Sequence, residues 1–267
     1  MVKVVNLLCF KERVNLMNIS VVSYLNSAPL VYGVTHSGLF DHSVILPDVP
    51  ARGAARLSAG EADLALVPVG AFPRHGEVEW ISDYCIGVEG PVRTVCLFSD
   101  CPPDEIRRVW LDSHSRTSVE LIRILARESW HRDWEFLPGS EGFEDWVISG
   151  QDAAVCIGDK VFKVEKKHPY KLDLAEEWKR FTGLPFVFAA WATKKHSDPE
   201  LIERLNEAQK FGITAIPQIA REWSKNLYLP EAEVLGYLMN NISYNFTPEK
   251  HQGLNLFHSY LNATRQS

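Results

Sequence analysis

Polar side chains gather where the first apolar segment of the chain ends. The apolar pattern of residues 18–24 predicts a buried strand that ends at Ser23 and Tyr24. Asn26 and Ser27 follow within three residues. Ligands of open α/β sheets bind outside the carboxyl ends of the strands, and an asparagine amide offers two donors and an acceptor there. We therefore expect Asn26 and its three hydroxyl-bearing neighbours to face a polar ligand. The alternative is that Asn26 or Ser27 only caps the next helix.

A helix start rich in hydroxyl groups follows a later predicted strand at residues 108–111. Four consecutive residues open this helix, which is predicted over residues 117–128: Ser115, Arg116, Thr117 and Ser118. The free N–H groups and positive dipole of a helix N-terminus attract anions, and a guanidinium fork fits a carboxylate. These groups exceed what capping requires, so we interpret them as a carboxylate site. The alternative is an ordinary capped helix, with Thr117 and Glu120 as its capping box and Arg116 as a surface residue.

Two further positions could carry chemistry, each with a plainer explanation. A strand predicted at residues 153–157 ends in Gly158, which lets backbone approach a ligand closely, and in Asp159. Asp159 has the chemistry of a general base, but capping of the helix that follows is the more conservative interpretation. Thr94, on an apolar segment beside Arg93, could present its hydroxyl to a ligand, although a threonine in a strand often serves only as a β-former.

Alternating strands and helices must position these residues. Strands predicted at residues 18–24, 43–46 and 62–67 are separated by helices, which indicates a parallel, doubly wound sheet. A strand-rich centre follows, at residues 78–81, 85–88 and 92–98, and then a second strand–helix–strand series. The apolar run 184–191 predicts a strand covered on both faces, and helices are predicted at 199–222, 231–239 and 248–261.

This order predicts an α/β protein of two lobes joined by two crossing segments, near residues 92–95 and 187–190. We expect an N-terminal extension at residues 1–16, the first part of lobe 1 at 17–92, lobe 2 at 93–189, and the completion of lobe 1 with the C-terminal helices at 190–267.

Composition narrows the classes of partner. The 267 residues carry a formal net charge of −6, and the only dense basic stretch, residues 160–171, is interrupted by other residues, so we expect no nucleic acid. Five cysteines without a CxxC pair, and histidines without an HExxH motif, predict neither a disulfide framework nor a metal site. Charges at residues 11–13 end the first apolar run, and no run approaches the ~20 residues that span a membrane. We therefore expect a cytoplasmic protein.

The usual signatures of dinucleotide, P-loop and α/β-hydrolase sites are absent from the sequence. Five blocks in chain order instead resemble the chorismate dehydratase family: SYLNSAPL at residues 23–30, GEADLALVP at 60–68, DSHSRTS at 112–118, IGD at 157–159 and LPFVFAAW at 184–191. The resemblance implies a two-lobed fold like that of type 2 periplasmic binding proteins, with the ligand between the lobes. It also implies a cofactor-free hydro-lyase of menaquinone biosynthesis by the futalosine route, which removes water from chorismate to give 3-[(1-carboxyvinyl)oxy]benzoate.

The resemblance assigns roles to particular residues and leaves the proton acceptor open. It implies that Asn26 is the key catalytic residue, acting by orientation or hydrogen bonding because an amide is not a base at neutral pH. The substrate's own enolpyruvyl carboxylate is one candidate acceptor, and Asp159 is the other. Thr94 stands where the family pattern has serine, and residues 160–162 (KVF) follow Asp159 where a run of smaller residues is usual. The alternative function is a binding protein that captures a small carboxylate without altering it. The sequence makes no prediction of the oligomeric state.

Overall fold

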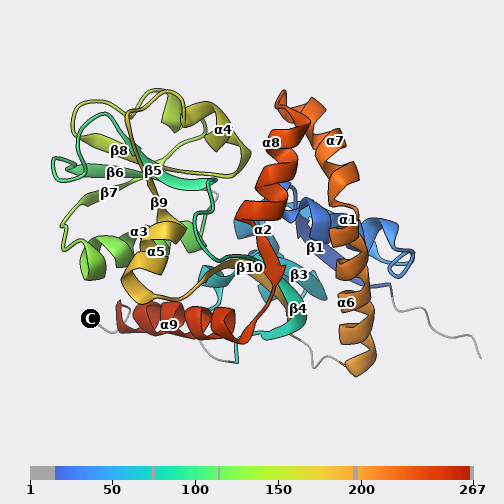
Figure 1. Cartoon of the computed structure of the whole chain (residues 1–267). Coiled ribbons are helices and arrows are strands. Elements are labelled where there is room, and N and C mark those ends of the chain that lie inside the picture. Colours follow the sequence, from blue (N-terminus) through green and yellow to red (C-terminus); the bar gives the residue numbers. More distant parts are fainter. Residues whose placement is uncertain (1–15, 74–75, 114, 195–197, 265–267) are drawn as a thin grey trace, which may run out of the picture.

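The computed structural model describes residues 16–73, 76–113, 115–194 and 198–264, and within them two β-sheets (Figure 1). The predicted extension lies outside these residues apart from Leu16. One sheet has the strand order β11-β4-β10-β3-β1-β2, and the other has the order β7-β6-β8-β5-β9. In Figure 1 the second sheet lies at the upper left, beside the first.

The six-stranded sheet contains the first strands of the chain and the last. Its members are β1 (Asn18–Val22), β2 (Val44–Asp48), β3 (Leu64–Pro68), β4 (Glu79–Val88), β10 (Phe186–Thr193) and β11 (Ser243–Asn245). β1 pairs in parallel with both β2 and β3, as the alternation of strands with α1 (Ala28–His36) and α2 (Pro50–Ala59) predicts. β10 then inserts antiparallel between β3 and β4. All residues of β3 are buried, as expected for a strand covered on both faces.

The five-stranded sheet contains β5 (Val95–Ser99), β6 (Arg108–Asp112), β7 (Glu135–Gly139), β8 (Asp152–Ile157) and β9 (Tyr170–Asp173). β6 is parallel to β7 and β8, while β5 is antiparallel to β8 and β9. α3 (Thr117–Ile124) and a π-helical turn, η3 (Leu125–Ser129), follow β6. α4 (Val161–Val164) and α5 (Leu174–Thr182) follow β8 and β9, and α5 packs on β5 and β9.

Several predicted elements differ from those observed. The strands predicted at 78–81 and 85–88 are one strand, β4, because Asn206 pairs with the polar residues at its centre: it accepts from the Ser82 hydroxyl (2.9 Å) and the Asp83 amide (3.0 Å). The helix predicted at 199–222 is two helices, α6 (Pro199–Thr214) and α7 (Ile216–Leu227), with Pro217 in the first turn of the second. β7 and β9 were not predicted. α8 (Glu231–Gly236) continues into a π-helical turn, η6 (Tyr237–Asn241), and α9 (Pro248–Thr264) ends the fold.

The chain changes sheets between β4 and β5 and returns between α5 and β10. Asp173 connects these two places: its carboxylate accepts from the backbone N–H groups of Val92 (3.1 Å) and Arg93 (2.6 Å), and it also caps α5. Arg93 has φ 66° and pairs through its guanidinium with Glu165 (2.6 Å) and Glu233. We propose where the lobes begin and end. Because β10 lies wholly in the six-stranded sheet, we place the end of lobe 2 at residues 183–185, earlier than the predicted end at residue 189.

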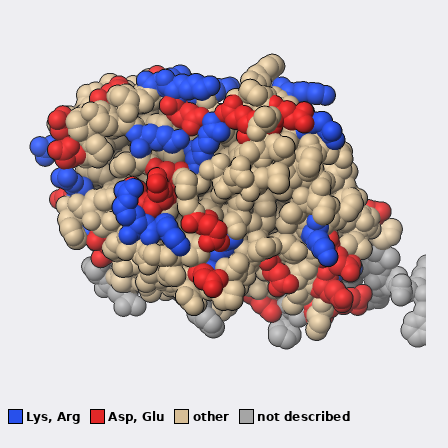
Figure 2. Space-filling view, in the orientation of Figure 1, with Lys and Arg blue, Asp and Glu red and all other residues tan. Residues whose placement is uncertain are grey.

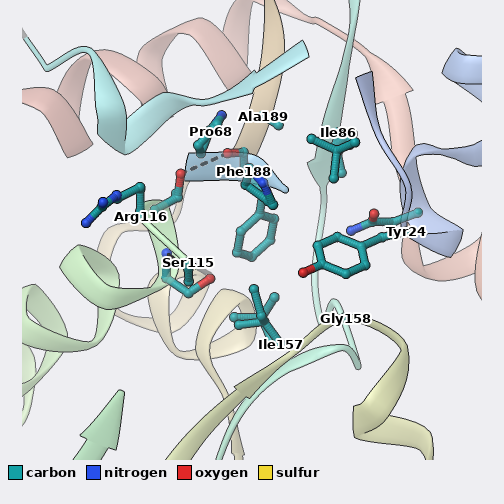
Figure 3. Close-up of a pocket in the computed structure, with 15 residues that line it drawn as sticks. Tyr24, Pro68, Ile86, Ser115, Arg116, Ile157, Gly158, Phe188 and Ala189 are labelled. Atoms are coloured by element: carbon teal, nitrogen blue, oxygen red, sulfur yellow. Dashed lines mark hydrogen bonds between the residues drawn. The ribbon is translucent and has the colours of Figure 1, made fainter. Parts of the chain in front are cut away.

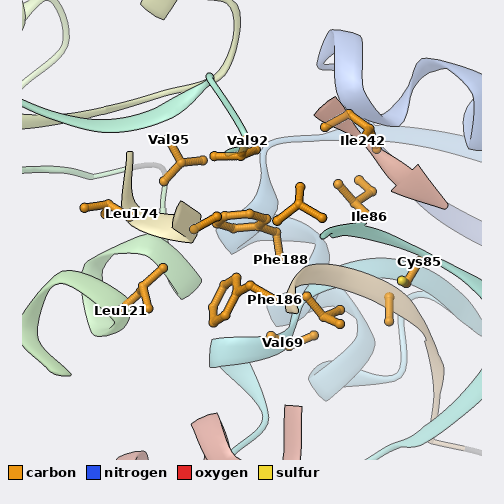
Figure 4. Packing of buried hydrophobic residues seen from close by; sticks show 14 of the residues in the cluster. Val69, Cys85, Ile86, Val92, Val95, Leu121, Leu174, Phe186, Phe188 and Ile242 are labelled. Carbon is orange, nitrogen blue, oxygen red and sulfur yellow. The ribbon is translucent and has the colours of Figure 1, made fainter. Parts of the chain in front are cut away.

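A continuous apolar layer extends under both sheets. Figure 4 shows Phe186 and Phe188 of β10 between residues of the second sheet's side, such as Leu121 and Val95, and Ile86 of β4. On the outer surface drawn in Figure 2, the Lys and Arg side chains are interspersed with Asp and Glu. The sheets thus share packed side chains, and the space between them at the carboxyl ends of their strands is where a ligand can enter.

Candidate functional site

A pocket lies between the two sheets and is lined from both sides. Its empty space, which includes open solvent at the mouth, is about 550 Å³. Residues of both candidate regions line it: Tyr24, Asn26, Ser115, Arg116, Thr117, Ser118 and Gly158. The fold therefore brings together two regions that lie about ninety positions apart in the chain.

Apolar side chains form the walls of this pocket. Figure 3 shows the Phe188 ring extending into the pocket from above and the Tyr24 ring from the right, with Ile86 at the upper right and Ile157 below. Phe188 and Ile86 were not predicted as site residues, because apolar strand residues of this kind give no signal that separates a pocket wall from core. The walls suit a flat ring, and the polar groups at the ends suit its substituents.

Asn26 lies on a short 3₁₀ turn, η1 (Leu25–Ser27), between β1 and α1. The Ser27 hydroxyl is fully buried and closes this turn: it lies 2.5 Å from the Val22 carbonyl oxygen and accepts from the Tyr24 amide (3.2 Å). Ser27 makes no side-chain cap to α1, so the predicted alternative of capping by Ser27 is wrong. Ser23 is exposed and is not among the residues that line the pocket. Of this group, Asn26 and Tyr24 reach the pocket, and Ser27 supports their backbone.

A residue near the other end of the chain also holds the turn. The Tyr244 hydroxyl, on β11, donates to the Asn26 carbonyl oxygen (3.1 Å) across a sequence separation of 218 residues. Tyr244 is buried, and burial raises its pKa well above the usual value, so the group stays a neutral donor. Sequence reasoning missed Tyr244 because it belongs to a three-residue strand without a local motif.

Tyr244→Phe is expected to lower the turnover of chorismate, the substrate that the family resemblance implies, while the fold is retained. The substitution removes one buried hydrogen bond, which costs about 0.5–1.5 kcal/mol in the free energy of unfolding, and leaves the Asn26 backbone less constrained. We expect kcat to fall several-fold with a smaller change in KM, measured beside a urea unfolding curve. Unchanged kcat in a variant that shows the expected loss of stability would mean that Tyr244 contributes to folding alone.

At the start of α3, the hydroxyl groups of Ser115 and Thr117 bind protein groups, whereas the sequence predicted that they face a ligand. Ser115 accepts from the Ser118 amide (3.1 Å) and so satisfies one N–H group of the first turn. The Thr117 hydroxyl accepts from the Gly70 amide (3.1 Å) and donates to the Phe188 carbonyl oxygen (2.9 Å), so it joins the two sheets. The predicted capping box of Thr117 and Glu120 is therefore wrong, and the N-cap position is Arg116, without a side-chain cap.

Arg116 is exposed, and in Figure 3 its side chain points away from the centre of the pocket. Its guanidinium is thus not directed at the pocket, although the residue lines it. What remains at this end is the N-terminus of α3 with the buried residues Ser115 and Ser118, a place that favours a negative charge.

Thr94 and Gly158 are linked beside the pocket. Thr94 is fully buried and its hydroxyl pairs with the Tyr237 hydroxyl at 2.7 Å, while its carbonyl oxygen accepts from the Gly158 amide (2.9 Å). Thr94 is not among the pocket-lining residues. Gly158 has φ 70°, and a Cβ there would lie 3.3 Å from the Tyr24 ring, so both backbone conformation and space favour glycine.

Asp159 lies in a second cavity next to the first, with Tyr24, Asp112 and Lys160 among its neighbours. Its carboxylate accepts from the Leu25 amide at 3.1 and 3.3 Å instead of capping the residues that follow it. Burial raises the pKa of the Asp159 carboxyl to about 6. Lys160 pairs with Asp112 (2.7 Å) and Glu144 (3.0 Å), so acidic groups predominate in this cavity, and a carboxylate ligand is better placed at α3.

Two features of the described residues bear on other functions. No three His, Cys, Asp or Glu side chains in the described ranges come together as a metal ion requires. No helix within those ranges is both long enough and apolar enough to span a membrane.

Comparison with solved structures identifies the fold. A protein of Archaeoglobus fulgidus superposes with a TM-score of 0.74 at 13% identity, covering 94% of this chain and 98% of its own. A Candida albicans protein described as having the generic periplasmic binding protein fold gives 0.66 at 14% identity, with 94% and 90% covered. The aliphatic sulphonate binding protein of Escherichia coli gives 0.60 at 15% identity, with 94% and 87% covered. The predicted periplasmic-binding-protein-like fold is confirmed.

Comparison of sequences identifies relatives. A chorismate dehydratase of Thermus thermophilus is 29% identical over 255 residues, which are 88% of this chain and 91% of that protein. A chorismate dehydratase of Campylobacter jejuni is 32% identical over 110 residues, which are 40% of this chain and 48% of that protein. The family model described as menaquinone biosynthesis matches residues 17–263. The predicted resemblance is therefore confirmed, and the chain belongs to the menaquinone biosynthesis family.

Proposed function

We propose that this protein is a chorismate dehydratase that works in the cytoplasm without a cofactor and releases 3-[(1-carboxyvinyl)oxy]benzoate. The observation that carries the proposal is a pocket that both Asn26 and the α3 N-terminus line, in a chain similar to a chorismate dehydratase over most of its length.

The chemistry of chorismate matches the groups available in this pocket. Chorismate carries two carboxylates, and loss of its C4 hydroxyl and C3 hydrogen as water makes the ring aromatic. We assign one carboxylate to the N-terminus of α3, where the helix dipole and the first-turn N–H groups stabilise negative charge. The ring then lies beside Phe188 and Tyr24, which both point into the pocket.

Asn26 is assigned to the reacting end of the substrate. An amide does not remove a proton at neutral pH, but its donors and acceptor hold a hydroxyl in place and stabilise charge that develops as the C–O bond breaks. Within the described residues no hydrogen bond occupies its side-chain amide, so these groups are available to a ligand.

We assign the C3 proton to the enolpyruvyl carboxylate of the substrate. A base held within the same molecule has a very large effective concentration, and closure of the lobes over the substrate would exclude water from the reacting groups. The other predicted acceptor, Asp159, directs its carboxylate to the Leu25 amide in the neighbouring cavity.

Incubation of the purified protein with chorismate tests the proposal, with products separated by chromatography and identified by mass. The expected result is an aromatic product lighter than chorismate by one water. Unchanged chorismate that nevertheless raises the melting temperature of the protein would favour a non-catalytic carboxylate-binding protein. Unchanged chorismate with no effect on melting would overturn the assignment of the ligand.

A further inference from the structure

Two short turns from opposite sheets meet beside the pocket. One is η1, which carries Asn26, and the other is η5 (Gly158–Lys160), which follows β8. The Leu25 amide donates to both carboxylate oxygens of Asp159, across a sequence separation of 134 residues. The Tyr24 ring packs against Gly158 next to this bond. The contact thus joins one sheet to the other and ends one residue before Asn26.

We propose that Asp159 is a positioning residue, not the proton acceptor: its carboxylate bridges the two lobes and fixes the turn that presents Asn26 to the substrate. This role is an addition to the proposed function and rests on it.

Three side chains hold the three residues of η1, and they come from different parts of the chain. Asp159 binds the Leu25 amide, Tyr244 donates to the Asn26 carbonyl oxygen, and the Ser27 hydroxyl closes the turn on Val22. Of these bonds, only the one from Asp159 comes from the five-stranded sheet. The orientation of the Asn26 backbone is therefore completed when the lobes are together, which couples closure to the assembly of the site.

The direction in which the Asp159 carboxylate points favours a positioning role over that of a general base. Both oxygens face the Leu25 amide, and Asp159 lines the second cavity instead of the pocket that holds Asn26. A base must lie within hydrogen-bond reach of the proton that it removes. Asp159 would have to give up its bond to the turn to reach the pocket.

The surroundings of Asp159 make its charge costly. The ionisable groups that share its cavity are Tyr24, Asp112, Glu141, Glu144 and Lys160, and Tyr237 packs nearby from η6. The ammonium of Lys160 already pairs with Asp112 and Glu144. Burial raises the pKa of Asp159 to about 6, although the bond from the Leu25 amide acts in the opposite direction. An asparagine at this position keeps an acceptor for the Leu25 amide and removes the cost of the charge.

The kinetic test compares Asp159→Asn with Asp159→Ala, using chorismate as substrate. If Asp159 positions the turn, Asp159→Asn retains kcat within about threefold, while Asp159→Ala loses about 10- to 100-fold because the turn is misplaced. Asp104→Asn, which changes an exposed aspartate of the same lobe, is the matched control and leaves kcat unchanged. An Asp159→Asn variant that is folded but as inactive as Asp159→Ala would overturn the proposal in favour of a base.

Thermal unfolding between pH 4 and pH 8 tests the contact without any substrate. A carboxyl group with a raised pKa contributes stability below its unfolded pKa and loses it as the pH rises through the folded value. We therefore expect Asp159→Asn to melt above the wild type at pH 8, with the difference disappearing toward pH 4, and Asp159→Ala to melt below Asp159→Asn. Identical melting of all three proteins across this range would mean that the contact is absent in solution. These melting temperatures test the contact between Asp159 and Leu25 even if the wild type does not convert chorismate.

Discussion

Asn26→Ala is expected to lower kcat for chorismate dehydration by about 10²- to 10³-fold, the usual effect of removing one positioned donor to developing charge. The substitution deletes only the side-chain amide. The backbone carbonyl that accepts from Tyr244 and the amide of Leu25 that donates to Asp159 both remain. We therefore expect the melting temperature and the circular dichroism spectrum to change little, so that the loss is a catalytic one.

Kinetics should distinguish this role from simple binding. If Asn26 acts on the transition state, kcat and kcat/KM fall together, whereas loss of ground-state binding raises KM alone. Ser23→Ala is the matched control, because Ser23 lies three residues away and is exposed outside the pocket lining. An Asn26→Ala variant with near-normal kcat would place the reacting end of the substrate elsewhere.

Gly70→Ala is expected to damage both stability and turnover, because it acts where the two lobes touch. Gly70 belongs to η2 (Val69–Ala71), directly after β3. A Cβ on Gly70 would lie 2.9 Å from the Thr117 Cα and 3.2 Å from the Arg116 carbonyl oxygen, both of which are backbone atoms at the start of α3. Inserting a methyl group into a packed contact costs about 1–3 kcal/mol.

The damage at Gly70 should reach the carboxylate site. To accommodate the methyl group, the start of α3 must shift away from β3, and the bonds of the Thr117 hydroxyl to Gly70 and Phe188 weaken. A shift of about 1 Å at a positioning element can cost about 10²-fold in rate, with KM rising because the anion site moves. Steady-state kinetics and a denaturation curve measure the two effects.

A second glycine provides the control for this substitution. Gly90 lies between β4 and β5, and a Cβ there would meet nothing within 4 Å. Gly90→Ala should therefore leave activity intact and leave stability equal or slightly improved, since alanine restricts the unfolded chain. If both variants behave alike, the close approach of Gly70 to Thr117 does not limit closure of the site.

Sequence patterns predicted the parallel strands β1, β2 and β3 and the position of the site at their carboxyl ends, because both follow from local alternation. The place of β10 between β3 and β4 could not be predicted, since it depends on pairing between residues far apart in the chain. β4 was divided in the prediction because Ser82 and Asp83 are polar at its centre. Only the fold brings Asn206 of α6 to their hydrogen-bonding groups.

The same distinction applies to the candidate site. Residue types indicated that hydroxyl groups gather near Asn26 and at the start of α3, and the pocket lies there. They could not indicate which hydroxyls are already engaged: Ser27 binds Val22, Thr117 binds Gly70 and Phe188, and Thr94 pairs with Tyr237. The three-dimensional fold determines which group each hydroxyl binds, and it also brings Tyr244 to Asn26. The roles of the predicted site residues remain proposals for the experiments above.

The double engagement of Asp173 has a consequence for the two segments that join the lobes. One carboxylate holds the backbone of the outgoing segment at Val92 and Arg93 and also caps α5, the helix that leads into the returning segment. Because one side chain holds the outgoing segment and caps the helix before the returning one, replacing Asp173 with alanine would release both places at once.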